Sequence, residues 1–430
     1  DATWLTLTAN ADTNQLTIAA DATTLANNTT TTATITIAGN EQTTAITETI
    51  QVSFYKSDAI TENNTLDITA NNNGVVTNPL LPQYYVATSN ELRSYHLYSN
   101  ELLSTTVISP ADTLLEQLVI HPNASIILAK ADEITVIDEN TSETTTHRYQ
   151  IDLSDMSIIE LTDADISNEP AKFIRLDGRY FVATSILEFA DQNLTRVGFD
   201  GANAFFARTF NVAEENQSIF ALDISTATEL NTIKRISAKI NDFGRNPITT
   251  EITHSYRPEL LGESEQISDF YVTANEQNIY AISPTSEWIS FDGTTFTDNG
   301  LINTNEAITN LALAHSSNDR PHYARFETDI GFKIDVYNEQ QTIINSIALG
   351  SNQPRTMQIA NGDSRAVLLS ASAIDLVSLS QFGSSTDKLS FNTNLGDSVI
   401  AQQALTLSNI GAGWQATANV PWLILTQQSD

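Results

Sequence analysis

Apolar and polar residues alternate in short runs along much of the chain. Examples are Trp4-Leu-Thr-Leu-Thr8, Ala33-Thr-Ile-Thr-Ile37 and Thr47-Glu-Thr-Ile-Gln-Val-Ser-Phe54. Successive side chains of a strand point to opposite faces, so each run predicts a strand with one buried face. Turn-rich segments such as Ala38-Gly-Asn40 separate the runs. The pattern therefore predicts an all-β protein.

A longer periodicity runs through residues 80–382. A short apolar strand, a turn and a second strand recur, and each copy ends near an acidic or aromatic residue. The copies are Tyr84–Tyr95, Ser125–Asp138, Arg179–Phe189, Phe205–Asp223, Asp269–Ile282, Leu311–Tyr337 and Ala366–Val377. These copies recur roughly every 43 residues, the length of a four-stranded propeller blade. The span predicts a seven-bladed β-propeller, and an array of β-sandwiches with a period of roughly 90–100 residues ranks second.

Two segments interrupt this periodicity, and a third segment precedes it. Residues 111–118 have weakly helical spacing, and residues 242–265 are expected to form a long excursion from a blade edge. Polar residues dominate 58–79, including Asn71-Asn-Asn-Gly74, and predict a linker. The sharpest blade copy ends in Ile134-Thr-Val-Ile-Asp138. This rhythm resembles the blade plan of WD40-like and YVTN-type propellers, although neither a Trp-Asp signature nor a Tyr-Val-Thr-Asn motif is present.

The two ends of the chain carry similar sequences. Trp4-Leu-Thr-Leu-Thr-Ala-Asn-Ala-Asp12 and Trp422-Leu-Ile-Leu-Thr-Gln-Gln-Ser-Asp430 share Trp, Leu, Leu, Thr and Asp at matching places. Residues 383–430, with Leu389-Ser-Phe391 near their start, resemble the first half of a BACON-type immunoglobulin-like module. Residues 1–57 resemble its second half. The predicted fold is thus a seven-bladed β-propeller flanked by partial immunoglobulin-like β-sandwich segments at both termini.

Half of a sandwich exposes an apolar face and an unpaired edge strand. Three arrangements cover them: flanking modules of a longer array, residues 387–430 folded onto residues 1–57, or the tail half of one copy paired with the head half of the next. The last contact is heterologous and grows into a filament unless it closes into a ring. The predicted assembly interface consists of Trp4, Leu5, Leu7, Trp414, Trp422, Leu423 and Leu425.

Charge and composition narrow the functional classes. The chain has 52 acidic and 20 basic residues, a net charge of −32, which disfavours binding to nucleic acid or anionic membranes. It has no cysteine, which excludes disulfides, thiolate metal sites and a Cys nucleophile. No apolar run is long enough for a membrane-spanning helix. Because the chain starts with Asp1 and lacks a signal-peptide pattern, we expect a processed segment of a secreted protein.

Candidate catalytic and metal-binding residues are scattered. The histidines have no metal-binding spacing, and we interpret them as structural or surface residues; they are His96, His121, His147, His254, His315 and His322. His315 and His322 flank a loop that also contains Asp319 and Arg320, and this spacing allows the two to meet, although a structural or surface role is favoured over a metal site. Four carboxylates, Asp152, Asp155, Asp163 and Asp165, suggest a solvated loop, with a calcium site as the alternative. No G-x-S-x-G elbow is present, and Asp-Gly pairs at 200–201 and 292–293 predict hairpin turns.

These features favour a non-enzymatic extracellular or cell-surface protein without a cofactor. We expect a structural or adhesive building block of a surface filament or repeat array, joined head-to-tail through its terminal half-sandwiches. Its main partner is then another copy of itself. The alternative is a secreted carbohydrate-binding or carbohydrate-active propeller protein whose partners are glycans, with the central face of the propeller as the site. Exposed Trp414 and Trp422 would suit sugar stacking, but the alternation around Trp422 favours burial of both in the sandwich core. An intracellular scaffold is the third hypothesis.

Overall fold

The computed structural model is all-β: its described residues contain strands and turns but no helix. The chain divides into two compact units, residues 1–378 and 379–430. The structure describes residues 2–10, 12, 15–38, 47–56, 64–68, 74–108, 113–138, 141–162, 171–176, 179–184, 188–199, 207–213, 218–223, 232–240, 247–256, 267, 269–273, 276–282, 288–292, 298–302, 313–317, 320–327, 331–337, 343–350, 353–360, 365–379, 383–384 and 407–408.

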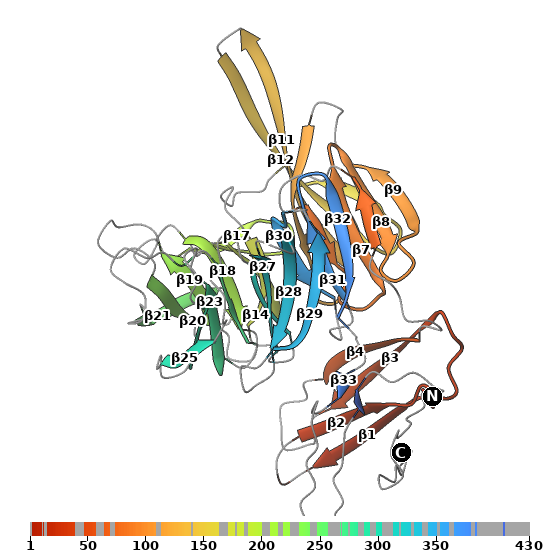
Figure 1. The fold of residues 1–430 in the computed structure, drawn as a ribbon. Helices are drawn as coiled ribbons and strands as arrows, with labels where there is room; N and C mark the ends of the chain where they lie inside the picture. Colours follow the sequence, from red (N-terminus) through yellow and green to blue (C-terminus); the bar gives the residue numbers. More distant parts are fainter. Residues whose placement is uncertain are drawn as a thin grey trace, which may run out of the picture. The chain divides into compact units, whose positions relative to one another are not determined.

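Four-stranded antiparallel sheets make up most of the first unit (Figure 1). The first contains β6 (Val75–Thr77), β7 (Gln83–Thr88), β8 (Glu91–His96) and β9 (Leu102–Val107). The second contains β10 (Thr113–Ile120), β11 (Ile126–Asp138), β12 (Thr141–Asp152) and β13 (Ile158–Glu160). The third contains β14 (Ala171–Leu176), β15 (Arg179–Thr184), β16 (Glu188–Ala190) and β17 (Arg196–Phe199).

Three further sheets follow the same order along the chain. They are β18 (Ala207–Ala213), β19 (Ser218–Asp223), β20 (Thr232–Ile240) and β21 (Pro247–Tyr256); β22 (Asp269–Val272), β23 (Asn278–Ile282), β24 (Trp288–Asp292) and β25 (Asp298–Ile302); and β26 (Leu313–Ser317), β27 (Arg320–Glu327), β28 (Gly331–Tyr337) and β29 (Ile343–Gly350). The seventh combines β30 (Thr356–Ile359), β31 (Arg365–Leu369) and β32 (Ala373–Ser378) with β5 (Asn64–Asp67).

Two-stranded sheets complete the described strands. In the first unit, β1 (Leu5–Asn10) pairs with β2 (Gln15–Ala20), and β3 (Thr29–Ala38) pairs with β4 (Thr47–Lys56). In the second unit, β33 (Gly383–Ser384) pairs with β34 (Leu407–Ser408). Val, Ile and Thr dominate β3 and β4, and such β-branched side chains fit a pleated surface.

The four-stranded sheets contact one another in order through their first strands. β6 contacts β10, and the contacts continue from β10 to β14, β18, β22, β26 and β30. β30 in turn contacts β6. The first sheet therefore has a neighbour on each side, like the sheets in the middle of the series.

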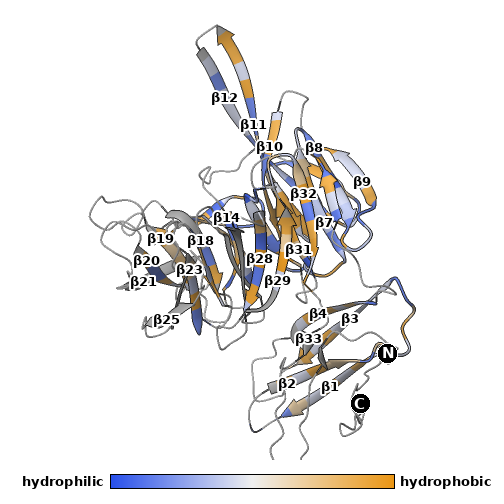
Figure 2. Ribbon diagram, viewed as in Figure 1, coloured by the Kyte–Doolittle hydropathy of each residue, from blue (hydrophilic) through white to orange (hydrophobic). Residues whose placement is uncertain are grey.

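Burial decreases from the second strand of a sheet to its fourth. All five residues of β31 are buried, whereas β9 is exposed at four of its six positions. Figure 2 shows the hydrophobic character of β31. A strand buried on both faces is apolar without alternation, and an outer strand needs few apolar residues. This explains why the recognisable repeats often coincide with second and third strands.

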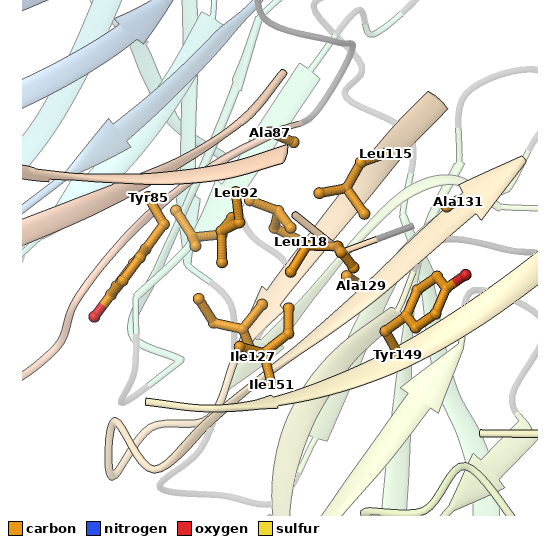
Figure 3. Close-up of a cluster of buried hydrophobic side chains, with 12 residues drawn as sticks. Tyr85, Ala87, Leu92, Leu115, Leu118, Ile127, Ala129, Ala131, Tyr149 and Ile151 are labelled. Carbon is orange, nitrogen blue, oxygen red and sulfur yellow. The ribbon is translucent and has the colours of Figure 1, made fainter. Parts of the chain in front are cut away.

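Hydrophobic clusters lie between adjacent sheets. Tyr85, Leu92 and Ala87 of the first sheet pack with Ile127 and Ile151 of the second (Figure 3). A comparable cluster joins the first sheet to the seventh, where Tyr84 packs with Ile374. At that boundary the Arg365 guanidinium also donates a hydrogen bond to the Leu97 carbonyl at 3.0 Å. Each sheet is thus stabilised mainly by the apolar surface that it buries against its neighbours.

The predicted linker over residues 58–79 needs correction, because it contains β5 and β6. β5 pairs with β32, and β6 begins the first sheet. Only one residue of β5, Leu66, is partly buried, while the other three are exposed. An outer strand of this kind has the polar composition of a linker, which hid it in the sequence.

Two predictions for the second sheet were wrong. Residues 111–118 were expected to be helical, but β10 is a strand with a bulge between Leu115 and Gln117. The bulge shifts the alternation, so buried Leu115 and Leu118 are three residues apart as in a helix. The predicted strand-turn-strand unit over 125–138 is the single strand β11. It contains no Gly, Pro or Asn to break it, and it pairs with β12 along its length.

The expected excursion over residues 242–265 is also partly wrong. Residues 247–256 form β21, the outer strand of the fourth sheet, paired with β20. Two shifts in register interrupt this pairing and disturb the alternation of apolar residues. The remainder of that segment, and the Asp-Gly pairs predicted as turns, lie largely outside the described residues.

Replacing Thr65 with Val is expected to lower the free energy of unfolding by about 1–3 kcal/mol. The Thr65 hydroxyl donates to the Asp375 carboxylate at 2.6 Å, and Asp375 is buried. Valine keeps the shape of the side chain but removes the donor. Urea denaturation measures the loss, and Thr105→Val on the exposed face of β9 is the matched control. An equal, small effect of both variants would contradict the assigned role of β5.

Candidate interaction surfaces

Trp4 is a core residue of the N-terminal hairpins. Its side chain is only 4% exposed, and its ring centroid lies 6.1 Å from that of Phe54 on β4. The Trp4 carbonyl accepts a hydrogen bond from the Asp21 amide at 2.7 Å. These contacts pack the start of β1 against β4, as expected for a core anchor. Leu5, the next residue, is half-buried.

Several aliphatic side chains of the same hairpins are exposed. Leu7 and Ile18 are cross-strand partners in β1 and β2 and are 46% and 41% exposed. On the other hairpin Ile37 and Ile50 are 44% and 39% exposed. Ile50 lies opposite buried Ile35, which shares a strand face with Ile37. We call these four exposed residues the hairpin surface.

The C-terminal part of the predicted interface lies outside the described residues. This applies to Trp414, Trp422, Leu423 and Leu425. Of the predicted residues on β1, Leu7 is the exposed one. Ile18, Ile37 and Ile50 were not predicted, although their alternation with Thr was visible in the sequence. Alternation shows that one face is apolar, but not whether another element covers it.

An aromatic cluster links the N-terminal hairpins to the first and seventh sheets. Tyr55 of β4 stacks on Tyr98 with ring centroids 4.7 Å apart and lies edge-on to His96 at 5.4 Å. Arg365, the first residue of β31, is buried, and its guanidinium lies 5.7 Å from the Tyr98 ring centroid. Such cation–π and stacked contacts favour a fixed arrangement. Sequence reasoning missed this cluster because its members are far apart in the chain and form no motif.

A polar network crosses three first strands. The Lys172 ammonium group of β14 donates to the Asn211 side-chain oxygen of β18 at 2.9 Å. The Asn211 amide donates to the Phe270 carbonyl of β22, also at 2.9 Å. Lys172 keeps contact with solvent, yet the surrounding protein lowers the pKa of its ammonium group, and Asp269 opposes that shift. The network ties adjacent sheets together.

The histidines occupy separate places in the described sheets. His121 is buried in the turn between β10 and β11, where its ring lies edge-on to Phe173 and Tyr180. These ring contacts and the burial of the side chain give His121 a structural role, as predicted, and burial also lowers the pKa of its imidazole. His315 and His322, whose positions in the sequence allow them to meet, are opposite each other in the backbones of β26 and β27.

The carboxylates considered for calcium stabilise a turn. Asp152 accepts hydrogen bonds from the backbone and hydroxyl groups of Ser154, and Asp155 accepts one from the Ser157 amide. Asp163 and Asp165 lie outside the described residues. Where side chains are described, no group of three His, Asp or Glu residues is placed to hold a metal ion.

His147 joins β12 to both neighbouring strands. Its Nδ1 lies 2.8 Å from the Glu160 carboxylate and its Nε2 lies 3.1 Å from that of Glu133. The hydrogen bond with Glu160 is the largest cause of a raised His147 pKa, and Glu133 adds to it against the opposing effect of burial. The imidazole therefore bridges β11, β12 and β13, and both carboxylates favour its protonated form.

The stability contributed by His147 is expected to fall with rising pH. Because the folded-state pKa is raised, the contribution is complete below the ordinary value of 6.5 and is lost as pH rises through the higher folded value. Unfolding free energies of the wild type and His147→Gln should thus differ more at acidic pH than at alkaline pH. Glu160→Gln should reduce this pH dependence. A difference that does not change with pH would contradict the assignment.

Comparison with known proteins places no family name on this arrangement. No model of a known protein family matches the chain, and no curated protein matches it. Within the described ranges there is no helix of the length and apolarity needed to cross a membrane. The fold defines the protein as an all-β chain of small antiparallel sheets with an exposed aliphatic surface on its N-terminal hairpins.

Proposed function

We propose that this protein is a structural building block of an extracellular filament or repeat array. In this proposal the four-stranded sheets form a closed seven-bladed β-propeller that acts as a rigid body. The contact of β30 with β6 supports closure, as does the apolar cluster that joins the first and seventh sheets. β5, which precedes the first sheet in the chain, pairs with β32 of the seventh sheet and would thereby join the first blade to the last.

The hairpin surface is the observation that carries the proposed function. Leu7, Ile18, Ile37 and Ile50 expose aliphatic area that would be buried by a second element. Residues 383–430 supply suitable alternating sequences, including Trp422-Leu-Ile-Leu-Thr426. Copies joined by the tail half of one and the head half of the next would bury this area at every junction. Strand addition and a repeating heterologous contact together produce a linear assembly.

The topology supplies a route for this exchange. The first residue of β5, Asn64, lies opposite Leu376 near the end of β32. The N-terminal hairpins and residues 383–430 are therefore tethered through adjacent strands of one sheet. Such tethering allows the halves to be exchanged between copies, in the manner of a domain swap. The tether also gives the two halves of one chain a high effective concentration for each other. The experiment must therefore distinguish closure within one chain from exchange between copies.

Composition supports an extracellular setting. The net charge of −32 keeps a large assembly soluble, and the absence of cysteine makes the fold independent of the redox state of its surroundings. The structural role is therefore proposed together with a location at or outside the cell surface.

Sedimentation velocity over a wide concentration range tests the proposal. The wild type is expected to form species that lengthen with concentration, and Leu7→Asn is expected to shift them towards the monomer. Leu102→Asn is the matched control, because Leu102 is 50% exposed on the outer strand β9. A monomer at every concentration would overturn the assembly, and a monomer destabilised by Leu7→Asn would show closure within one chain. Specific binding on a glycan array would favour the carbohydrate-binding alternative instead.

A further inference from the structure

The hairpin formed by β11 and β12 extends beyond its own sheet (Figure 1). β11 has 13 residues and β12 has 12, whereas β10 has eight and β13 has three. Pairing with β10 reaches Glu133, and pairing with β13 reaches Tyr149. From Ile134 to Asp138, β11 pairs only with β12 among the described strands. We call residues 134–145 the arm.

The arm exposes aliphatic side chains. Ile134, Val136 and Ile137 are 48%, 73% and 60% exposed, and Figure 2 shows the hydrophobic far end of β11. The register places Ile134 and Val136 on one face with Leu114 of β10, which is 41% exposed. A two-stranded ribbon without a hydrophobic core is only marginally stable by itself. A strand laid along this part of β11 would cover the aliphatic face and satisfy open backbone groups.

The charge of the arm selects the chemistry of that strand. Five carboxylates and no Lys or Arg lie between Lys130 and His147; they are Asp132, Glu133, Asp138, Glu139 and Glu143. Lys130 pairs with Asp132 at 3.0 Å, and His147 pairs with Glu133. The sequence of residues 134–145 contains three carboxylates and no Lys, Arg or His. The acidic arm of a second copy would be repelled at this edge, which disfavours the pairing of two arms. A cationic segment would be attracted.

We propose that the arm is a docking site for an extended segment of another protein, in which Lys or Arg alternates with aliphatic residues. The segment adds as a strand to the β11 edge. The main chain of the segment pairs with Ile134 to Asp138, and its aliphatic residues pack on Ile134 and Val136. Its cations lie on the other face of the arm, where Glu143 is opposite Thr135. Recognition by strand addition derives affinity from the main chain and specificity from alternate side chains. The site is independent of the hairpin surface.

A labelled peptide of alternating Lys and Val residues provides the probe, and fluorescence anisotropy measures its binding to the full chain. The Lys–Val peptide is expected to bind, with an affinity that falls as salt is raised. A Glu–Val peptide and a Lys–Val peptide of scrambled order are the comparison ligands. Equal affinity for all three peptides, or no binding of the alternating Lys–Val peptide, would overturn the proposal.

The double variant Ile134→Thr, Val136→Thr keeps β-branched residues in the arm but removes apolar contact area. It is expected to weaken binding roughly tenfold, equivalent to about 1.4 kcal/mol. Ile159→Thr is the matched control, since Ile159 is 58% exposed on β13 of the same sheet but lies outside the arm. Glu143→Gln tests the charge and should weaken binding and reduce its salt dependence. An equal loss in Ile159→Thr, or self-association that the double variant abolishes, would contradict the assigned partner.

Discussion

Replacing Arg235 with Gln is expected to lower the free energy of unfolding by about 3–5 kcal/mol. Arg235 of β20 donates to one oxygen of the Glu276 carboxylate through Nε at 3.0 Å and through a terminal nitrogen at 2.6 Å. The Glu276 side chain is only 2% exposed. Removing the guanidinium leaves a buried carboxylate without its cation, and β20 and the segment before β23 belong to neighbouring sheets. The variant therefore weakens a boundary between two sheets as well as a single pair.

A double-mutant cycle separates this ion pair from general charge effects. Glu276→Gln in the Arg235→Gln background should recover part of the lost stability, because no buried charge is then left alone. Lys239→Gln removes one positive charge from the exposed part of the same strand, and it should change the unfolding free energy by less than about 0.5 kcal/mol. Urea denaturation of the wild type, the two single variants of the pair, their double variant and Lys239→Gln provides the comparison. Equal effects of Arg235→Gln and Lys239→Gln would contradict the role of the pair.

Ile374→Ala and Ile236→Ala are expected to destabilise the protein by similar amounts, about 2–5 kcal/mol each. Both side chains are fully buried. Ile236 packs between the third and fourth sheets, and Ile374 packs between the first and the seventh. If the sheets form a closed propeller, the boundary between the first and seventh sheets is as well packed as the boundary between the third and fourth. The same deletion then leaves a comparable cavity at each place.

The comparison of these two variants tests closure directly. In an open series of sheets the first and seventh would each have one face in solvent, and Ile374→Ala would cost much less than Ile236→Ala. Unfolding followed by both fluorescence and circular dichroism shows whether the boundary unfolds together with the rest. A small effect of Ile374→Ala alone would count against the closed propeller.

The sequence predicted strands best where burial leaves a local mark. β7 and β31 are buried and almost continuously apolar, and both lie within repeats recognised from the sequence. β5 and β9 are both mostly exposed; β5 is largely polar, and half of β9 consists of Ser and Thr. The backbone of an outer strand can pair with a neighbour whatever its side chains are. Composition therefore carries little information about outer strands, and β5 was assigned to a linker.

Local irregularity caused the other errors. The bulge after Leu115 gave β10 the spacing of a helix, and the register shifts in β20 and β21 hid a strand inside an apparent excursion. In β11 the turn expected within residues 125–138 is absent, because pairing with β12 keeps the chain extended. These features depend on the partner strand, which the alternation within one segment does not reveal.

The candidate surfaces were predicted only in part. Trp4 and Leu7 were both predicted from the sequence repeated at the two ends of the chain, but Trp4 is buried within the chain and Leu7 is exposed. The Tyr55, Tyr98 and Arg365 cluster left no signal in the sequence, since its members come from separate elements. The first part of the arm was predicted to belong to a strand-turn-strand unit over residues 125–138. The arm extends beyond its sheet because β10 and β13 are shorter than β11 and β12, which the sequence did not indicate.

By itself the sequence determined that this is an all-β chain with a recurring two-strand unit and a strongly acidic surface. Those properties follow from alternation, period and charge, which are local or additive. Only the tertiary structure decided which strands pair across long distances, such as Thr65 with Asp375, 310 positions apart. It also decided which apolar faces are covered. The physical reason is that pairing and burial are properties of two surfaces in contact, whereas a sequence segment describes only one of them.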